Sequence, residues 1–464
     1  MSTVPLYLLG AAILLLLVLI LRFKFNPFLA LILTSFGLGL ANRMAPQAVL
    51  NSILKGAGDT YGSIFLIIVA GASIGKLIEE SGAAVQVSRT FTRFFGVTRV
   101  QIAMVLTGFL VGLPMFYNAG FLVLTPLVYA VSIETGYPII YLGLPLSAAL
   151  SVTHGFVPPH PGPTTIANIF HADLNLTLLY GVILAVPATV LGGPFLSRFM
   201  RQMKNQPPPE FYQHREFRDE DLPSFGLSLF TILIPVLLML IGAIVNLTMP
   251  AGSQMVKVSA FVSDANIALM IGLFVAMWTL GMRRGMSMEG VMKLVVAAGS
   301  SVALLLLIIA AGGGFKQVLL DSGVADVIKA ISAQSAMSPL VLAWTTAAFV
   351  RFAVGSATVA GIAAAGIVLP MIPGSGVRPE LLVIAVSSGS LMFSHLNDTG
   401  FWMFKEYYNA SVKQTFQVWT TMECTVGTVG LVGVLILNAI VGPPPPPAAP
   451  VAQVGSAPAL ARAR

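Results

Sequence analysis

The chain has 464 residues, of which 56% are apolar and 9% are charged. Soluble domains carry about 25% charged residues, so this composition excludes a soluble globular enzyme and predicts an integral membrane protein. The net charge is +7, but no basic patch carries interleaved aromatic residues, which argues against nucleic-acid binding. The single cysteine, Cys424, excludes an internal disulfide framework, a cysteine-based zinc site and an iron–sulfur cluster.

Apolar runs of membrane-spanning length follow one another along the chain and predict an all-α polytopic membrane protein. Residues 4–22 are nearly continuous Leu, Ile, Val and Ala, and Arg22 and Lys24 follow them rather than precede them. This order favours a retained first helix with an outside N-terminus over a cleaved signal peptide. Further apolar runs lie near residues 27–42, 61–79, 100–133, 138–155, 175–197, 225–247, 264–281, 292–320, 337–373, 380–396 and 415–441.

Two of these runs, 100–133 and 337–373, are too long for one helix and are interrupted by glycine-containing segments at 112–120 and 355–361. We expect each run to form a re-entrant hairpin, which leaves about ten full crossings. Most of the 25 Lys and Arg residues then fall in inside loops, as the positive-inside rule requires. Both termini are predicted to lie outside.

An internal repeat is indicated by matches at one fixed offset. A shift of 241 positions superposes Ser81-Gly82 on Ser322-Gly323, Ala119-Gly120 on Ala360-Gly361, and Thr153-His154 on Ser394-His395. Each half would hold five crossings and one hairpin, and an odd number of crossings makes the halves inverted, as in many secondary transporters. The predicted domains are a first repeat at 1–200, a cytoplasmic linker at 201–223, a second repeat at 224–441, and a disordered Pro/Ala-rich tail at 442–464.

Four irregular segments mark the expected binding site. Two are breaks in predicted helices, at 153–165 with its four prolines and at 394–400, and two are the hairpin tips 116–120 and 355–358. In a bilayer, broken helices are tolerated only where they face protein or a water-filled cavity. Half-helix N-termini offer free N–H groups and positive dipole ends, so this cluster suits an oxygen-rich anion such as a hydroxylated carboxylate.

Proton coupling is assigned to titratable residues in these breaks. Asp398 is the only acidic residue in a break and is the first candidate; its alternative role is to cap the following segment toward Lys405. His154 and His395 are further candidates because histidine titrates near neutral pH. The same histidines, and His160, could instead orient backbone carbonyl groups.

Substrate contacts are assigned to polar side chains of the same segments. The alternative role of these side chains is to hydrogen-bond the backbone groups of the hairpins and of the helix breaks. The expected set is Asn118, His154, His160, Thr164, Ser356, Thr358, Asn397 and Thr399. Arg351 lies one helical turn before the second hairpin tip and would attract the substrate's charge, or else snorkel. Glu423 is expected to pair with a neighbouring helix rather than to contact substrate.

Catalytic and cofactor-binding motifs are missing from the sequence. It contains no nucleophile elbow, phosphate loop, zinc-type His-Glu-x-x-His or glycine-rich dinucleotide fingerprint. We therefore expect no enzyme activity, no cofactor and no ATP site, which favours secondary transport. A metal site is not expected, because no carboxylate is close in sequence to His154 and His160.

The chain resembles the gluconate permease (gluconate:proton symporter) family of bacterial inner membranes from about residue 5 to residue 441. The motifs that carry the resemblance are residues 112–121, residues 154–163, Arg351 with residues 355–360, and residues 394–402. The resemblance implies import of gluconate or a related sugar acid, driven by the proton gradient through alternating access. By analogy it also implies a homodimer. Members of the family take gluconate, other aldonates, hexuronate derivatives, glycerate or D-serine.

One departure from the family concerns Asn118, because many members carry Glu at this position. Coupling in this chain would then fall to Asp398 or to a histidine, and the substrate preference could be shifted. The rival within the same class is a sodium-coupled carboxylate carrier. Rivals from other classes are a passive channel and an intramembrane enzyme.

Overall fold

The computed structural model is all-helical and describes residues 4–203, 205–206, 217–250, 253–324, 327, 337–373, 375–396 and 398–443. The tail predicted from residue 442 lies almost wholly outside the described residues, and the predicted linker is described only at 201–203, 205–206 and 217–223. The first half contains α1 (Val4–Leu21), α2 (Pro27–Ala41), α3 (Pro46–Glu80), α4 (Ala83–Phe95), α5 (Val100–Gly112), α6 (Tyr117–Thr135), α7 (Ile139–Phe156), α8 (Pro161–Phe170) and α9 (Leu174–Val190). The second half contains α10 (Phe225–Thr248), α11 (Gln254–Val262), α12 (Ala265–Ala276), α13 (Met288–Asp321), α15 (Pro339–Val354), α16 (Ala357–Val368), α17 (Pro379–Gly389), α18 (Thr399–Tyr407), α19 (Val412–Thr415) and α20 (Thr421–Val441).

The helices confirm an integral membrane protein. Within the described residues, eight helical spans are long and apolar enough to cross a membrane. The pair α4 and α5, which is bent by 110°, would make a ninth. Five shorter apolar helices accompany them, at Tyr7–Ile20, Pro27–Ala41, Pro339–Phe352, Ala357–Met371 and Pro379–Gly389.

Two segments that the apolar runs left as loops are helical. Helix α3 begins at Pro46, where proline fits the first turn, so Lys55 lies on this helix instead of in an outside loop. Residues 83–95, expected in an inside loop, form α4, whose apolar face is buried while Arg93 stays exposed. Hydropathy alone missed the first part of α3 and the whole of α4, because polar residues interrupt the apolar pattern there.

The described end of the linker is held against α4. Asp219 accepts hydrogen bonds from Arg89 and from Arg93, the latter at 3.2 Å. The hydrogen bond from Arg93, together with the charges of both arginines, holds the pKa of the Asp219 carboxyl below its usual range. Arg284 donates to the backbone carbonyl of Asp221. These contacts secure the chain just before the second half begins at α10.

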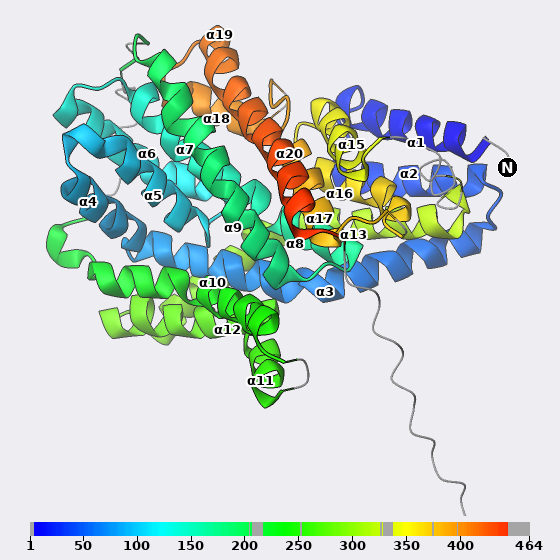
Figure 1. The fold of residues 1–464 in the computed structure, drawn as a ribbon, viewed down its shortest axis with the longest axis horizontal. Coiled ribbons are helices and arrows are strands. Elements are labelled where there is room, and N and C mark those ends of the chain that lie inside the picture. The colour runs from blue at the N-terminus through cyan, green and yellow to red at the C-terminus, as the bar shows by residue number, and fades with distance from the viewer. Residues whose placement is uncertain are drawn as a thin grey trace, which may run out of the picture.

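The longest helices, α3 and α13, pack against each other in antiparallel orientation (Figure 1). The Ser52 hydroxyl donates to the Asp321 carboxylate at 2.6 Å, while further along α3 Gly56 and Thr60 contact Gly313. Because the contacts run in opposite order along the two helices, their directions are opposed. Glycine at the crossing lets the two backbones approach closely, as is common for helices packed in membranes.

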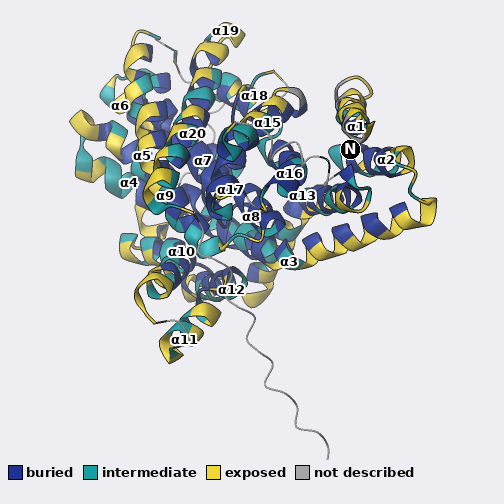
Figure 2. Ribbon diagram, turned by 45° about the vertical axis from the view of Figure 1, so that its right-hand side comes forward, coloured by how far each residue is buried: buried dark blue, intermediate teal, exposed yellow. Residues whose placement is uncertain are grey.

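Burial increases toward the centre of the helix assembly (Figure 2). Nearly every described residue of α7 and α17 is buried, whereas large apolar side chains such as Phe230, Ile241 and Phe274 are exposed on outer helices. An outward-facing apolar surface suits contact with lipid. The breaks that follow α7 and α17 begin in this buried centre, where His160 and Ser394 are buried, although Leu396 in the second break is exposed.

The crossing of α3 and α13 generates a stability prediction. A Cβ atom at Gly56 would lie 2.3 Å from the carbonyl oxygen of Gly313, whereas one at Gly58 meets open space. We expect Gly56→Ala to destabilise the fold by about 1–3 kcal/mol through overpacking. Gly58→Ala, the control on the same helix, should leave stability unchanged or slightly raised. Melting temperatures in detergent test this, and equal values for both variants would contradict it.

Candidate functional site

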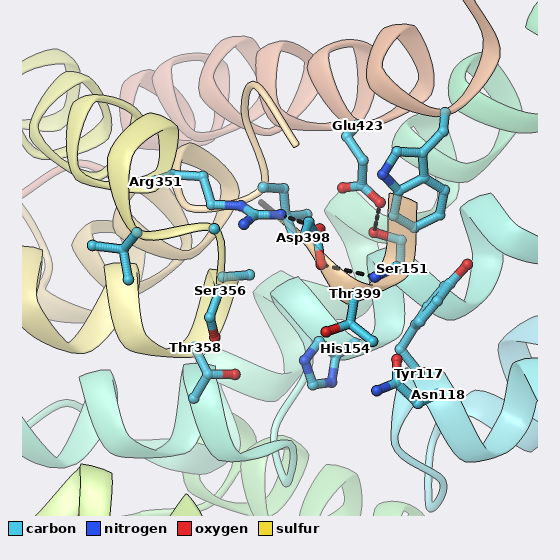
Figure 3. A pocket seen from close by; sticks show the side chains of 16 residues that line it. Tyr117, Asn118, Ser151, His154, Arg351, Ser356, Thr358, Asp398, Thr399 and Glu423 are labelled. Atoms are coloured by element: carbon cyan, nitrogen blue, oxygen red, sulfur yellow. Dashed lines mark hydrogen bonds and ion pairs between the residues drawn. The ribbon is translucent and has the colours of Figure 1, made fainter. Parts of the chain in front are cut away.

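A cavity of about 280 Å³ lies among the helix breaks (Figure 3). It is bounded by the N-terminal ends of α6, α16 and α18 and by side chains of α7, α15 and α20. Its polar lining residues are Tyr117, Asn118, Ser151, His154, Arg351, Ser356, Thr358, Asp398, Thr399, Trp419 and Glu423. Small-molecule sites typically occupy roughly 300–1,000 Å³, so this volume suits a compact ligand.

Three helix N-termini converge on this cavity. Helix α16 follows Gly355, whose positive φ of 78° lets the chain turn out of α15. The Ser356 hydroxyl then accepts the backbone N–H of Val359, and the Asp398 carboxylate caps α18 by accepting the N–H of Gly400 at 2.9 Å. The third terminus is that of α6. Their aligned peptide dipoles make the cavity favourable for negative charge.

A buried ion pair joins two of the breaks. Arg351, on α15, is 2% exposed and its Nη2 donates to Asp398, which also accepts the Ser394 hydroxyl. The Arg351 Nε and Nη1 atoms have no hydrogen-bond partner within the described part of the chain. Asp398 thus does cap the following helix, as one sequence interpretation held, but Lys405 pairs with Glu406 instead, at 2.7 Å. Arg351 therefore keeps donor capacity at the cavity wall.

A second buried carboxyl group lines the cavity. Glu423, on α20, is 2% exposed, and its Oε1 accepts the Ser151 hydroxyl at 2.7 Å. Its Oε2 has no hydrogen-bond partner among the described residues. Glu423 does pair with a neighbouring helix, as expected from the sequence, because Ser151 belongs to α7. The cavity-facing position was not expected.

The structure brings together part of the site set predicted from the sequence. Asn118, His154, Ser356, Thr358 and Thr399 line the cavity together with Arg351 and Asp398. Asn397 lies outside the described residues. Tyr117, Ser151 and Trp419 also line the cavity and were not selected from the sequence; the location of Tyr117 beside Asn118 was the available signal.

Three predicted residues lie away from the cavity lining. The His160 Nε2 atom is 2.6 Å from the carbonyl oxygen of Gly112, and the His395 Nε2 atom is 2.9 Å from that of Phe352. Both histidines thus contact backbone carbonyls, the alternative that the sequence left open. Thr164 is buried on α8. In the described ranges no three His, Cys, Asp or Glu side chains are grouped as metal ligands would be.

Comparison with known proteins identifies the family. Residues 4–440 match the GntP family permeases. The chain belongs to this family. A high-affinity gluconate transporter of Escherichia coli strain K12 is 45% identical over 94% of this chain and all of that protein. The Gnt-II system L-idonate transporter of the same organism is 44% identical over 94% of this chain and 99% of its own length.

The fold of this GntP permease is also found in a solved transporter structure. The YdaH transporter of Alcanivorax borkumensis superposes with a TM-score of 0.61 and 16% sequence identity, covering 86% of the permease and 90% of that chain. This similarity shows a common fold. The family match makes the chain a multi-pass membrane transporter and not an enzyme.

The ion pair of the permease predicts non-additive mutations. Arg351→Met and Asp398→Leu each leave a buried charge unpaired, which should cost about 3 kcal/mol. The double variant should lose less free energy of unfolding than the sum of the two single losses, and the coupling energy should be about 2 kcal/mol. The cap of α18 is lost in both variants that lack Asp398, so its contribution cancels in this double-mutant cycle. Thermal unfolding in detergent gives the four stabilities.

The exposed pair Lys405 and Glu406 provides the control for that cycle. Its side chains are 26% and 56% exposed, so the coupling measured with Lys405→Met and Glu406→Leu should stay below about 1 kcal/mol. Strictly additive losses at Arg351 and Asp398 would contradict the interpretation that each charge requires the other.

Proposed function

We propose that this permease imports gluconate or a closely related sugar acid together with protons, by alternating access between the two sides of a bacterial inner membrane. The observation that carries the proposal is the buried Arg351, which lines the cavity and whose Nε and Nη1 atoms have no hydrogen-bond partner among the described residues. Buried donors are costly unless they are hydrogen-bonded, so a bound anion would stabilise this arrangement. The substrate class is suggested by two relatives, a gluconate transporter and an L-idonate transporter.

The substrate carboxylate is placed at Arg351 in this proposal, because guanidinium and carboxylate groups match in geometry as well as in charge. The hydroxyls of the acid then reach hydroxyl and amide groups contributed by Asn118, Ser356, Thr358 and Thr399. The three helix N-termini around the cavity add to the attraction for the anion. The other predicted contacts, His154, His160, Thr164 and Asn397, remain proposals.

The transport mechanism would use two inverted repeats, residues 1–200 and 224–441, joined by the cytoplasmic linker 201–223. Supporting features are the antiparallel pairing of α3 and α13, which contain 35 and 34 residues, and the recurrence of a break before α6 and α16 and before α8 and α18. About ten crossings, with hairpins at α5–α6 and α15–α16 and two broken helices, follow from this arrangement. Both termini would lie outside, and homodimerisation is proposed by analogy.

Proton binding requires a titratable group at the cavity. The sequence predicts Asp398, with His395 and His154 as further groups. Asp398, His154 and Glu423 line the cavity, so a proton could bind at any of the three.

An uptake assay in proteoliposomes tests the function. With an inward proton gradient we expect labelled gluconate to accumulate above its external concentration, and without the gradient we expect only equilibration. Unlabelled L-idonate, glycerate, D-serine and hexuronates as competitors rank the substrates. Accumulation that follows a sodium gradient instead would establish the sodium-coupled rival, and uptake that never exceeds equilibration would establish a passive channel.

The hydroxyl contacts predict a graded loss of affinity. Thr358 lines the cavity, and Thr358→Val removes one hydroxyl at nearly constant volume. We expect the KM for gluconate to rise about three- to tenfold, the equivalent of one hydrogen bond. Thr165→Val is the matched control, because Thr165 is buried on α8, is absent from the lining and is not a predicted contact. A larger change for Thr165→Val than for Thr358→Val would contradict this placement of the substrate.

A further inference from the structure

We propose that Glu423, hydrogen-bonded to Ser151, is the group that binds the coupled proton, while the Arg351–Asp398 pair stays charged and holds the substrate. The inference rests on the proton symport proposed above and names its proton site. It is carried by the different surroundings of the two carboxyl groups that share the cavity.

The Asp398 carboxylate is fully engaged as an anion. It accepts from the guanidinium of Arg351, from the Ser394 hydroxyl and from the N–H of Gly400. Ser394 is itself oriented by the indole N–H of Trp419, which donates to its oxygen at 2.7 Å. A proton added to Asp398 would disrupt a charge-assisted pair and leave a buried guanidinium without its counter-charge.

Glu423, unlike Asp398, is not paired with a cation in the described part of the chain. No ion pair of Glu423 is present among the described residues, and its one hydrogen bond comes from a neutral hydroxyl. Glu423 lines the cavity, and its second oxygen is buried without a hydrogen-bond partner in the described part of the chain. A carboxyl group in a membrane interior that is not paired with a cation is costly as an anion, and an unpartnered carboxyl oxygen is able to take up a proton.

Several titratable and charged groups surround Glu423. Tyr117, His154, Arg351 and Asp398 share the cavity with it, and the charges of the Arg351–Asp398 pair oppose each other. Cys424 is its neighbour in sequence. Two other helices packed on α20 carry titratable residues, Tyr180 on α9 and Glu380 on α17. On these helices Leu184 contacts Gly433 and Ser388 contacts Gly430, both well beyond Glu423 along α20. Tyr180 and Glu380 lie still further along, toward the opposite end of α20.

This arrangement couples the proton to the substrate through charge. With Arg351 and Asp398 neutralising each other, an ionised Glu423 and a substrate carboxylate would place two uncompensated negative charges in one small cavity, where repulsion is strong. A proton on Glu423 removes one of them, so proton and substrate favour each other's binding reciprocally. The proton is taken from water on one side and returned to water on the other, and no bond of the substrate changes.

The test uses Glu423→Gln in proteoliposomes, because glutamine imitates the protonated carboxyl and keeps the bond to Ser151. We expect exchange of labelled for unlabelled gluconate at equal pH to remain within about threefold of wild type. Gradient-driven accumulation should fall to equilibration, and substrate-dependent proton entry, followed with a trapped pH dye, should disappear. Glu289→Gln, at an acid that is 78% exposed on α13, is the control and should leave both activities intact.

Ser151→Ala provides a second variant that keeps the titratable group. The Ser151 hydroxyl stabilises the ionised form, so without it Glu423 should hold its proton to higher pH. We expect the pH at which uptake is half-maximal to rise by about one unit, the equivalent of one hydrogen bond to a charged group. If Glu423→Gln fails to fold, this measurement alone tests the assignment of the proton site to Glu423.

The outcomes separate the two proposals. If the wild-type protein does not accumulate gluconate on a proton gradient, the proposed symport is wrong. If the wild type accumulates gluconate and Glu423→Gln does so equally, with normal proton entry, the assignment of Glu423 is overturned. The same holds if Ser151→Ala leaves the pH profile unmoved. If Asp398→Asn, and not Glu423→Gln, abolishes coupling while exchange persists, the proton belongs to Asp398.

Discussion

A guanidinium group in the interior of a membrane protein must be paired, and the pairing of Arg351 with Asp398 organises the site. Arg351 lies in the last turn of α15, just before the break at Gly355, and Asp398 is the N-cap of α18. Their ion pair therefore ties the α15–α16 break to the α17–α18 break. Because either charged group is costly to bury alone, the ion pair fixes the positions of the two breaks relative to each other. As a result the N-termini of α16 and α18 both lie at the same cavity.

The two carboxyl groups of this cavity illustrate how environment assigns function to chemically similar residues. Asp398 is surrounded by a cation, a hydroxyl and a backbone N–H, whereas Glu423 receives one hydroxyl from Ser151. Groups placed in such contrasting surroundings are the usual basis for dividing charge-holding and proton-carrying roles between residues. In the proposed mechanism this division would separate substrate attraction from proton uptake while keeping both in the same cavity.

The class of protein and the location of the site were predictable from the sequence, for different reasons. Apolar runs indicate spans because lipid excludes unsatisfied backbone groups. The break at 153–165 was visible because its prolines interrupt a helix. The break at 394–400 was visible as a run of polar residues between apolar segments. Asn118, Thr358 and Asp398 lie in predicted breaks or tips and line the cavity, so the irregular segments correctly indicated much of the lining.

The sequence by itself determined that this chain is a helical membrane protein with its polar groups gathered at interrupted helices, because hydropathy and helix breaking are local properties. Only the tertiary structure decided which side chains share the cavity. His160 lies in a predicted break yet contacts the carbonyl of Gly112, while Ser151 and Glu423 come from regular parts of α7 and α20, 272 positions apart. Side-chain direction depends on how distant helices pack, and no local pattern in the chain encodes that packing.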